Sequence, residues 1–219
     1  MLDLSRKLTD KLVIDDKEYA LDLSFDNILK MFEMMRDDDI PEYIKPHFAI
    51  RMLISKSLAG DTREEKAESF NKDFENYSIE EMSKVFKSVF EEHISLSDVK
   101  DNHVEYDLAG NPMKTTASDD TKQRAPYDIR YDGDYIYASF MQAYGIDLFD
   151  VQGKLHWKKF NALLSGLPEG TKFMEVIKIR KWKPQKGDSA EYKEEMRRLQ
   201  KDYALPNEII EEEEYEEEF

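Results

Sequence analysis

The sequence predicts a mainly α-helical protein (α+β class) with two helical lobes, a small N-terminal β-hairpin and an acidic C-terminal tail. Apolar residues recur at helical intervals through most of the chain. They alternate with polar residues only near the N-terminus, and they lose periodicity between about residues 95 and 126. So long an irregular stretch is unusual inside one compact domain and therefore marks a boundary. The expected segments are a hairpin plus helical lobe (1–95), a linker (96–126), an aromatic-rich helical lobe (127–206) and the acidic tail (207–219).

The hairpin is expected around Asp15-Asp16-Lys17, which separate two short apolar runs. In the second run, apolar residues alternate at Tyr19, Leu21 and Leu23, which is the period of a half-buried strand. Ser24 then occupies the N-cap position of a first helix. The apolar face of that helix consists of Phe25, Ile28, Leu29, Phe32 and Met35.

Three more helices are expected in the first lobe. The second helix covers about residues 48–58. Thr62 with Glu65, and Ser78 with Glu81, form the capping-box patterns that open the next two helices. The last of these has the clearest apolar face, which consists of Met82, Val85, Phe86, Val89 and Phe90.

The second lobe is expected to contain short helices around residues 136–144, 155–164, 173–177 and 189–203. Aromatic residues recur on adjacent faces of these helices, and such residues pack in cores more often than they bind partners. We therefore predict that the core of this lobe is formed by Tyr135, Tyr137, Phe140, Tyr144, Trp157 and Phe160.

Composition argues against an enzyme. The 219 residues include no cysteine, which excludes disulfides, thiol nucleophiles and cysteine zinc sites. The four histidines lack metal-ligand spacing, and no phosphate-loop, dinucleotide or hydrolase motif occurs. We therefore expect no catalytic, cofactor-binding or metal-binding residues. Since neither a signal peptide nor an apolar run of membrane-spanning length is visible, we expect a soluble protein of the cytoplasm.

The charge distribution points to protein partners. The net charge is −16, and eight glutamates lie in the last twelve residues, so the field of the chain repels phosphate backbones and nucleic acid is not expected as a partner. A local basic stripe surrounds Trp182. It is compatible with nucleic acid, but it is explained better by a helix C-terminus or by acidic residues of this chain or a partner. The stripe consists of Lys172, Lys178, Arg180, Lys181 and Lys183.

The acidic tail has two interpretations. A block of like charge stays open and solubilises the chain. Apolar residues between the glutamates instead suggest a segment that orders on contact with a basic protein surface. On the second interpretation, the candidate partner-binding residues are Ile209, Ile210, Tyr215 and Phe219.

Several motifs resemble a phage protein family. They are Tyr135–Leu148, Leu155-His156-Trp157, Phe160–Pro168, Thr171-Lys172, Arg180 and Leu199–Pro206, together with the hairpin start at Ile14–Tyr19. The family is usually called bacteriophage gene product fifteen and occurs in siphophages and prophages of low-GC Gram-positive bacteria. The resemblance spans about residues 10–206.

The resemblance implies a gene between those for the major tail protein and the tape-measure protein, where long-tailed phages encode tail-assembly chaperones. Such a chaperone would bind the helical tape measure in the host cell cytoplasm and help to recruit tail-tube subunits to it. The alternative is a permanent structural component of the tail or connector. A homo-oligomer is left open. The helices near 78–94 and 189–203 are expected to line an apolar channel for the partner.

Overall fold

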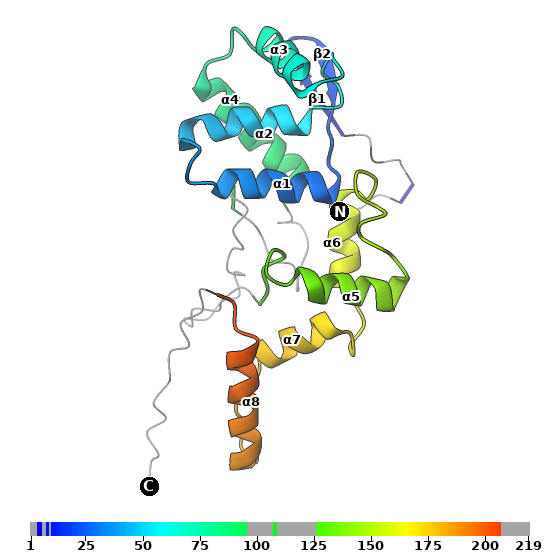
Figure 1. The fold of residues 1–219 in the computed structure, drawn as a ribbon, viewed down its shortest axis with the longest axis vertical. Coiled ribbons are helices and arrows are strands. Elements are labelled where there is room, and N and C mark those ends of the chain that lie inside the picture. Colours follow the sequence, from blue (N-terminus) through cyan, green and yellow to red (C-terminus); the bar gives the residue numbers. More distant parts are fainter. Residues whose placement is uncertain (1–3, 6–7, 9, 96–106, 109–125, 207–219) are drawn as a thin grey trace. The chain divides into compact units, whose positions relative to one another are not determined.

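The computed structural model describes residues 4–5, 8, 10–95, 107–108 and 126–206 (Figure 1). These residues form helices and one two-stranded antiparallel sheet, which confirms the mainly α (α+β) fold class with an N-terminal hairpin. The elements of the first half are β1 (Lys11–Ile14), β2 (Lys17–Ala20), α1 (Phe25–Arg36), η1 (Glu42–Ile44), α2 (Lys45–Leu53), α3 (Arg63–Asp73), α4 (Ile79–Val89) and η2 (Phe90–Ile94). Those of the second half are α5 (Gly133–Tyr144), α6 (Trp157–Ser165), α7 (Lys172–Arg180) and α8 (Ala190–Asp202).

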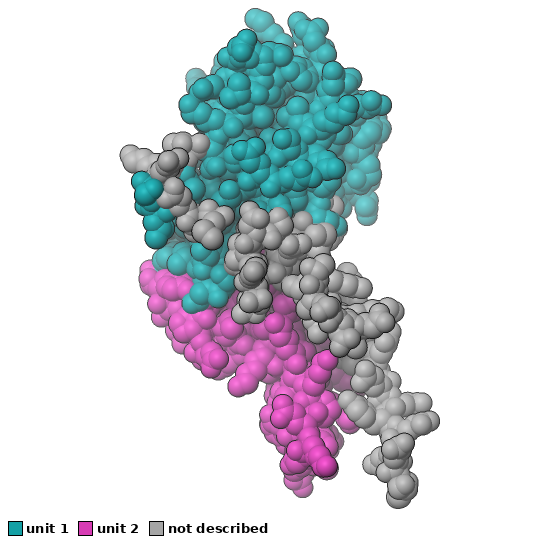
Figure 2. Space-filling view, turned by 180° about the vertical axis from the view of Figure 1, so that it is seen from behind, with its two compact units in different colours: residues 1–125, 146–166 teal, residues 126–145, 167–219 magenta. Residues whose placement is uncertain are grey.

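The chain divides into two compact units, coloured separately in Figure 2. Unit 1 comprises residues 1–125 and 146–166, and unit 2 comprises residues 126–145 and 167–219. This division differs from the predicted lobes, because residues 146–166 group with the N-terminal helices and not with the rest of 127–206. The acidic tail and most of the predicted linker lie outside the described residues.

The hairpin forms at the predicted place. Asp15 and Asp16 both adopt left-handed backbone conformations, with φ of 47° and 61°, as the tightest hairpin turns require. The strands then pair Leu12 with Tyr19 and Ile14 with Lys17. Tyr19 is buried, and its ring lies 5.6 Å from that of Phe74.

In unit 1, α2 packs against both α1 and α4 (Figure 1). Both predicted capping boxes are present, at Thr62 and at Ser78. Ser24 is at the N-cap of α1 but makes no side-chain cap, and its hydroxyl donates to Asp22 Oδ1 at 2.9 Å. Helix α2 begins at Lys45, earlier than predicted, since proline is well accommodated in a first turn. The core includes Ile28, Met31, Phe32, Ile50, Leu53, Phe70 and Phe86.

In unit 2, α7 packs against α5 and against α8. Ser139 of α5 is fully buried, and its hydroxyl accepts the backbone N–H of Phe173 at 3.0 Å, at the start of α7. Helix α5 ends at Gly145, whose φ of 63° suits the left-handed cap position. The apolar core of the unit includes Tyr127, Ile136, Phe140, Phe173 and Val176. No helix among the described residues has the length and apolar character needed to cross a membrane.

Candidate functional site

The Leu-His-Trp motif opens α6 inside unit 1. The Trp157 side chain is fully buried, and its indole N–H donates to the carbonyl of Ile94 at 2.9 Å. Its ring meets Phe32 edge-on at 5.9 Å, and Phe160 stacks on Phe25 at 5.0 Å. Trp157 and Phe160 are therefore core residues, as predicted, but of unit 1. Their assignment to the core of the second lobe was wrong.

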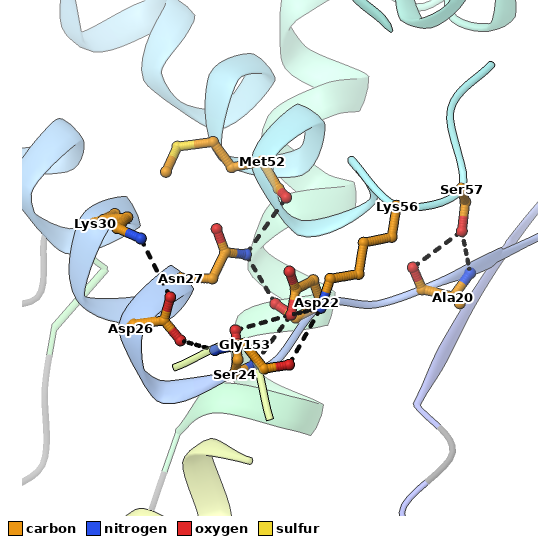
Figure 3. A network of polar contacts seen from close by, with 10 residues as sticks. All are labelled: Ala20, Asp22, Ser24, Asp26, Asn27, Lys30, Met52, Lys56, Ser57 and Gly153. Carbon is orange, nitrogen blue, oxygen red and sulfur yellow. Dashed lines mark hydrogen bonds and ion pairs between the residues drawn. The ribbon is translucent and has the colours of Figure 1, made fainter. Parts of the chain in front are cut away.

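Backbone pairing joins this motif to the start of α1. The Phe25 N–H donates to the Leu155 carbonyl at 2.9 Å, and the Trp157 N–H donates to the Leu23 carbonyl at 2.7 Å. Figure 3 shows a further contact, in which the Gly153 N–H donates to Asp26 Oδ1 at 2.7 Å. These bonds fix residues 153–157 against the beginning of α1 and explain why 146–166 belongs to unit 1.

A carboxylate of unit 1 lies between two imidazoles. Asp10 Oδ1 is 3.1 Å from His93 Nδ1, and Asp10 Oδ2 is 2.8 Å from His156 Nε2. The hydrogen bonds from His156 and His93 hold the pKa of Asp10 well below its ordinary range. His156 Nδ1 accepts the N–H of Lys158 as the N-cap of α6, so both ring nitrogens of His156 are engaged. The three side chains connect the residue before β1 to η2 and to the start of α6, and we call Asp10, His93 and His156 the Asp10 clasp.

Unit 2 is organised around a buried ion pair. The guanidinium of Arg180 contacts both carboxylate oxygens of Asp132 at 2.7 Å, with side-chain exposures of 8% and 1%. Arg180 Nε also donates to the Tyr203 carbonyl at 2.6 Å. Lys172 donates to the Tyr203 hydroxyl at 2.6 Å, which raises the pKa of Lys172. These contacts secure the end of α8 to α7, so Lys172 and Arg180 of the sequence motif have structural roles.

The exposed side of α5 is the candidate partner-binding surface. This twelve-residue helix carries a single charged residue, Asp134, in a chain that is 37% charged. Met141 is 40% exposed, with Tyr137 and Tyr144 half-buried one helical turn to either side. We call Tyr137, Met141 and Tyr144 the α5 face. A helix with apolar residues on both sides has more apolar surface than its own unit buries. Sequence reasoning had assigned its tyrosines to the core.

The structure gives a different outcome for each of the three partner surfaces that the sequence predicted, which are the acidic tail, α4 and α8. Ile209, Ile210, Tyr215 and Phe219 lie outside the described residues. The apolar face of α4, including Met82 and Phe86, fills the core of unit 1 and is not accessible to a partner, so its expected role in a channel is wrong. In α8 only Met196 is buried. Tyr192 of α8 is exposed and meets Trp182 edge-on at 5.9 Å.

A cluster of metal ligands is absent from the residues that the structure describes. Within them, no group of three or more histidine, aspartate or glutamate side chains is placed to hold a metal ion. The Asp10 clasp contains one carboxylate and two imidazoles, but those imidazoles contact the carboxylate itself.

Comparison with known families identifies the chain over most of its length. Residues 8–205 match the family described as Bacteriophage Gp15 protein, and the chain belongs to that family. Searches of curated proteins and of solved structures found no match. Bacteriophage Gp15 proteins are not a known family of enzymes.

Proposed function

We propose that this member of the Bacteriophage Gp15 family is a tail-assembly chaperone without catalytic activity. It binds the tape-measure protein in the host cell cytoplasm and helps to recruit tail-tube subunits during tail morphogenesis. The observation that carries the proposal is the family match over residues 8–205. Partner specificity then depends on surfaces, so the exposed apolar side chains of the helices become the features to test.

The α5 face supports binding of a helical partner. Two helices bind each other through apolar residues spaced at i, i+4 and i+7 along one face, and Tyr137, Met141 and Tyr144 of α5 have this spacing. Methionine is unbranched and polarisable, so Met141 can adapt to the varied apolar side chains of a long helical partner. Tyrosine combines a large apolar area with a polar hydroxyl, which suits a surface that is wet before binding.

The charge of the chain supports the same function. A net charge of −16 makes complexes repel one another, which opposes aggregation of the apolar helices that a chaperone covers. The α5 face is then a local apolar surface on a strongly charged protein. This combination suits a protein that binds an aggregation-prone partner for a limited time.

Co-expression with the tape-measure protein tests the binding surface. The wild-type chain should raise the soluble yield of the tape measure, and Met141→Glu should abolish the increase by placing a charge in the α5 face. Ile79→Glu is the matched control, because Ile79 is 49% exposed and lies in the first turn of α4, where a glutamate is well tolerated. Equal yields with both variants would contradict a binding role for the α5 face, and no increase with wild type would contradict the chaperone function.

Mass spectrometry of purified virions separates the chaperone from a permanent component. A chaperone should be present in infected cells and absent from finished particles. Detection of the chain in virions at a fixed ratio to the tail-tube protein would instead identify a structural component of the tail or connector.

A further inference from the structure

Unit 2 carries an exposed surface of surplus positive charge. Between Lys178 and Lys186 the chain has five basic residues and no acidic one. Arg180 forms an ion pair with Asp132, but the four lysines are exposed and make no ion pair with any described residue. We call Lys178, Lys181, Lys183 and Lys186 the lysine segment.

The lysine segment is not needed to complete the end of α7. The side-chain amide of Gln200, from α8, donates to the carbonyls of Ile179 and Trp182 at 3.0 and 2.9 Å. Carbonyls at a helix C-terminus are the groups that basic side chains otherwise satisfy. Gln200 and the backbone N–H groups of Lys181 and Trp182 donate to carbonyls at this end of α7, so the lysine segment is available for an acidic group.

The same chain contains a segment of complementary charge. Residues 207–219 hold eight glutamates and no basic residue, interspersed with Ile209, Ile210, Tyr215 and Phe219. Beside the lysine segment, Trp182 is half-buried and forms an edge-on pair with exposed Tyr192 at 5.9 Å. The lysine segment and the aromatic pair are thus complementary to an acidic peptide that carries apolar side chains.

The geometry also places the end of the described chain beside this surface. The Tyr203 carbonyl accepts from Arg180 at 2.6 Å, and Gln200 bonds to Trp182, so both neighbours of Lys181 contact the C-terminal part of α8. The thirteen residues after Pro206 can extend over about 40 Å, which is longer than α7 or the loop that follows it.

We propose that the lysine segment binds the acidic segment 207–219 of the same chain. Individual exposed lysine–glutamate pairs are weak, so binding depends on several pairs acting together and on the local concentration that the short connection provides. The same-chain segment is therefore favoured over that of a second copy. The bound segment neutralises the positive charge of the lysine segment. This inference does not depend on the proposed chaperone function.

Zero-length carbodiimide cross-linking of the full chain, read by mass spectrometry, tests the contact. Glutamates of 211–218 should cross-link preferentially to the lysine segment, and in an equal mixture of isotopically light and heavy chains the products should join residues of one chain. Products joining light to heavy chains would overturn the same-chain contact in favour of a second copy. Cross-links spread evenly over the lysines of both units would overturn the binding site itself.

A matched pair of variants separates specific binding from general attraction. The triple change Lys178→Glu, Lys181→Glu and Lys183→Glu should reduce tail cross-links to the remaining Lys186 by about tenfold at low ionic strength. Lys72→Glu, Lys84→Glu and Lys87→Glu change the net charge equally, on exposed positions of unit 1, and should leave those cross-links unchanged. An equal reduction in both triple variants would contradict the proposal, and so would cross-linking of wild type that persists at high salt. Far-UV circular dichroism checks that each variant is folded.

Discussion

The buried polar groups of the two units find their partners in different ways. Unit 1 packs an extensive aromatic core around Trp157, whose single polar atom is satisfied by a backbone carbonyl. Unit 2 buries a complete ion pair, Arg180 with Asp132, and connects it to Tyr203 near the end of the described chain. Truncating a buried apolar side chain lowers the free energy of unfolding in proportion to the volume removed. Removing one member of a buried ion pair instead leaves the other charge buried and uncompensated. The comparison predicts that the aromatic core of unit 1 responds to a loss of volume and that the Arg180–Asp132 pair of unit 2 responds to a loss of charge.

The largest effect is expected from Trp157→Ala. Removing a fully buried tryptophan side chain should lower the free energy of unfolding by about 5 kcal/mol. The loss should fall on unit 1, measured as faster hydrogen exchange in α1 and α6, with α5 and α7 unchanged. Trp182→Ala is the control, since Trp182 is only half-buried and lies in unit 2. Faster exchange confined to unit 2 in Trp157→Ala would contradict the assignment of the motif.

Asp132→Asn should be the most damaging conservative change in unit 2. It keeps the size of the side chain but leaves Arg180 buried without its counter-charge, which should cost about 3 kcal/mol in thermal or chemical unfolding. Asp134→Asn, at an exposed position in the first turn of the helix that Asp132 precedes, is the control and should be nearly neutral. The double replacement Asp132→Leu with Arg180→Met should recover stability relative to Asp132→Asn. No recovery would show that the remaining contacts of Arg180, and not its charge, determine the loss.

The Asp10 clasp gives unit 1 a sensitivity to acid. The folded pKa of Asp10 is depressed by His156 and His93, so its contribution to stability is present above the unfolded pKa of about 4 and is lost as the pH falls through the folded value. Asp10→Ala should cost about 2 kcal/mol at neutral pH. It should also flatten the acid limb of the stability profile, measured by urea unfolding at several pH values. An acid limb as steep as that of wild type would exclude Asp10 as its source.

The smallest effects are expected from the helix caps. Ser78 accepts the N–H of Glu81 in unit 1, and Ser189 accepts the N–H of Tyr192 in unit 2, at 3.2 and 3.1 Å. Replacing either serine by alanine should cost about 1 kcal/mol. Each change should speed hydrogen exchange only in its own unit. Equal acceleration of exchange in both units by either serine replacement would show that units 1 and 2 unfold together, and would contradict their treatment as separate units.

Local signals predicted local structure well. The hairpin turn and the caps at Thr62 and Ser78 depend on residues within four positions of one another, and all three are present. The grouping of 146–166 with unit 1 depends instead on bonds such as Gly153 to Asp26, which are 127 residues apart. Helical periodicity records which residues face inward but not which helix they face, so Trp157 was recognised as a core residue and placed in the wrong core.

The candidate surface was harder to predict for a related reason. Apolar residues on both sides of α5 predict burial, and only the packing of unit 2 shows that Ile136 and Phe140 are covered while Met141 remains exposed. Conversely, the strong amphipathic pattern of α4 marked it as a partner surface, although its apolar face fills the core of unit 1. Periodicity alone does not distinguish a face that the chain itself covers from one that remains exposed.

Hydrogen exchange of the complex with the tape-measure protein tests the central claim, that the α5 face of unit 2 is the surface that binds the partner. Binding should slow amide exchange in α5, since covering Tyr137, Met141 and Tyr144 opposes opening of that helix, and should leave α2 and α4 unchanged. Slower exchange in α4 with α5 unaffected would contradict the account.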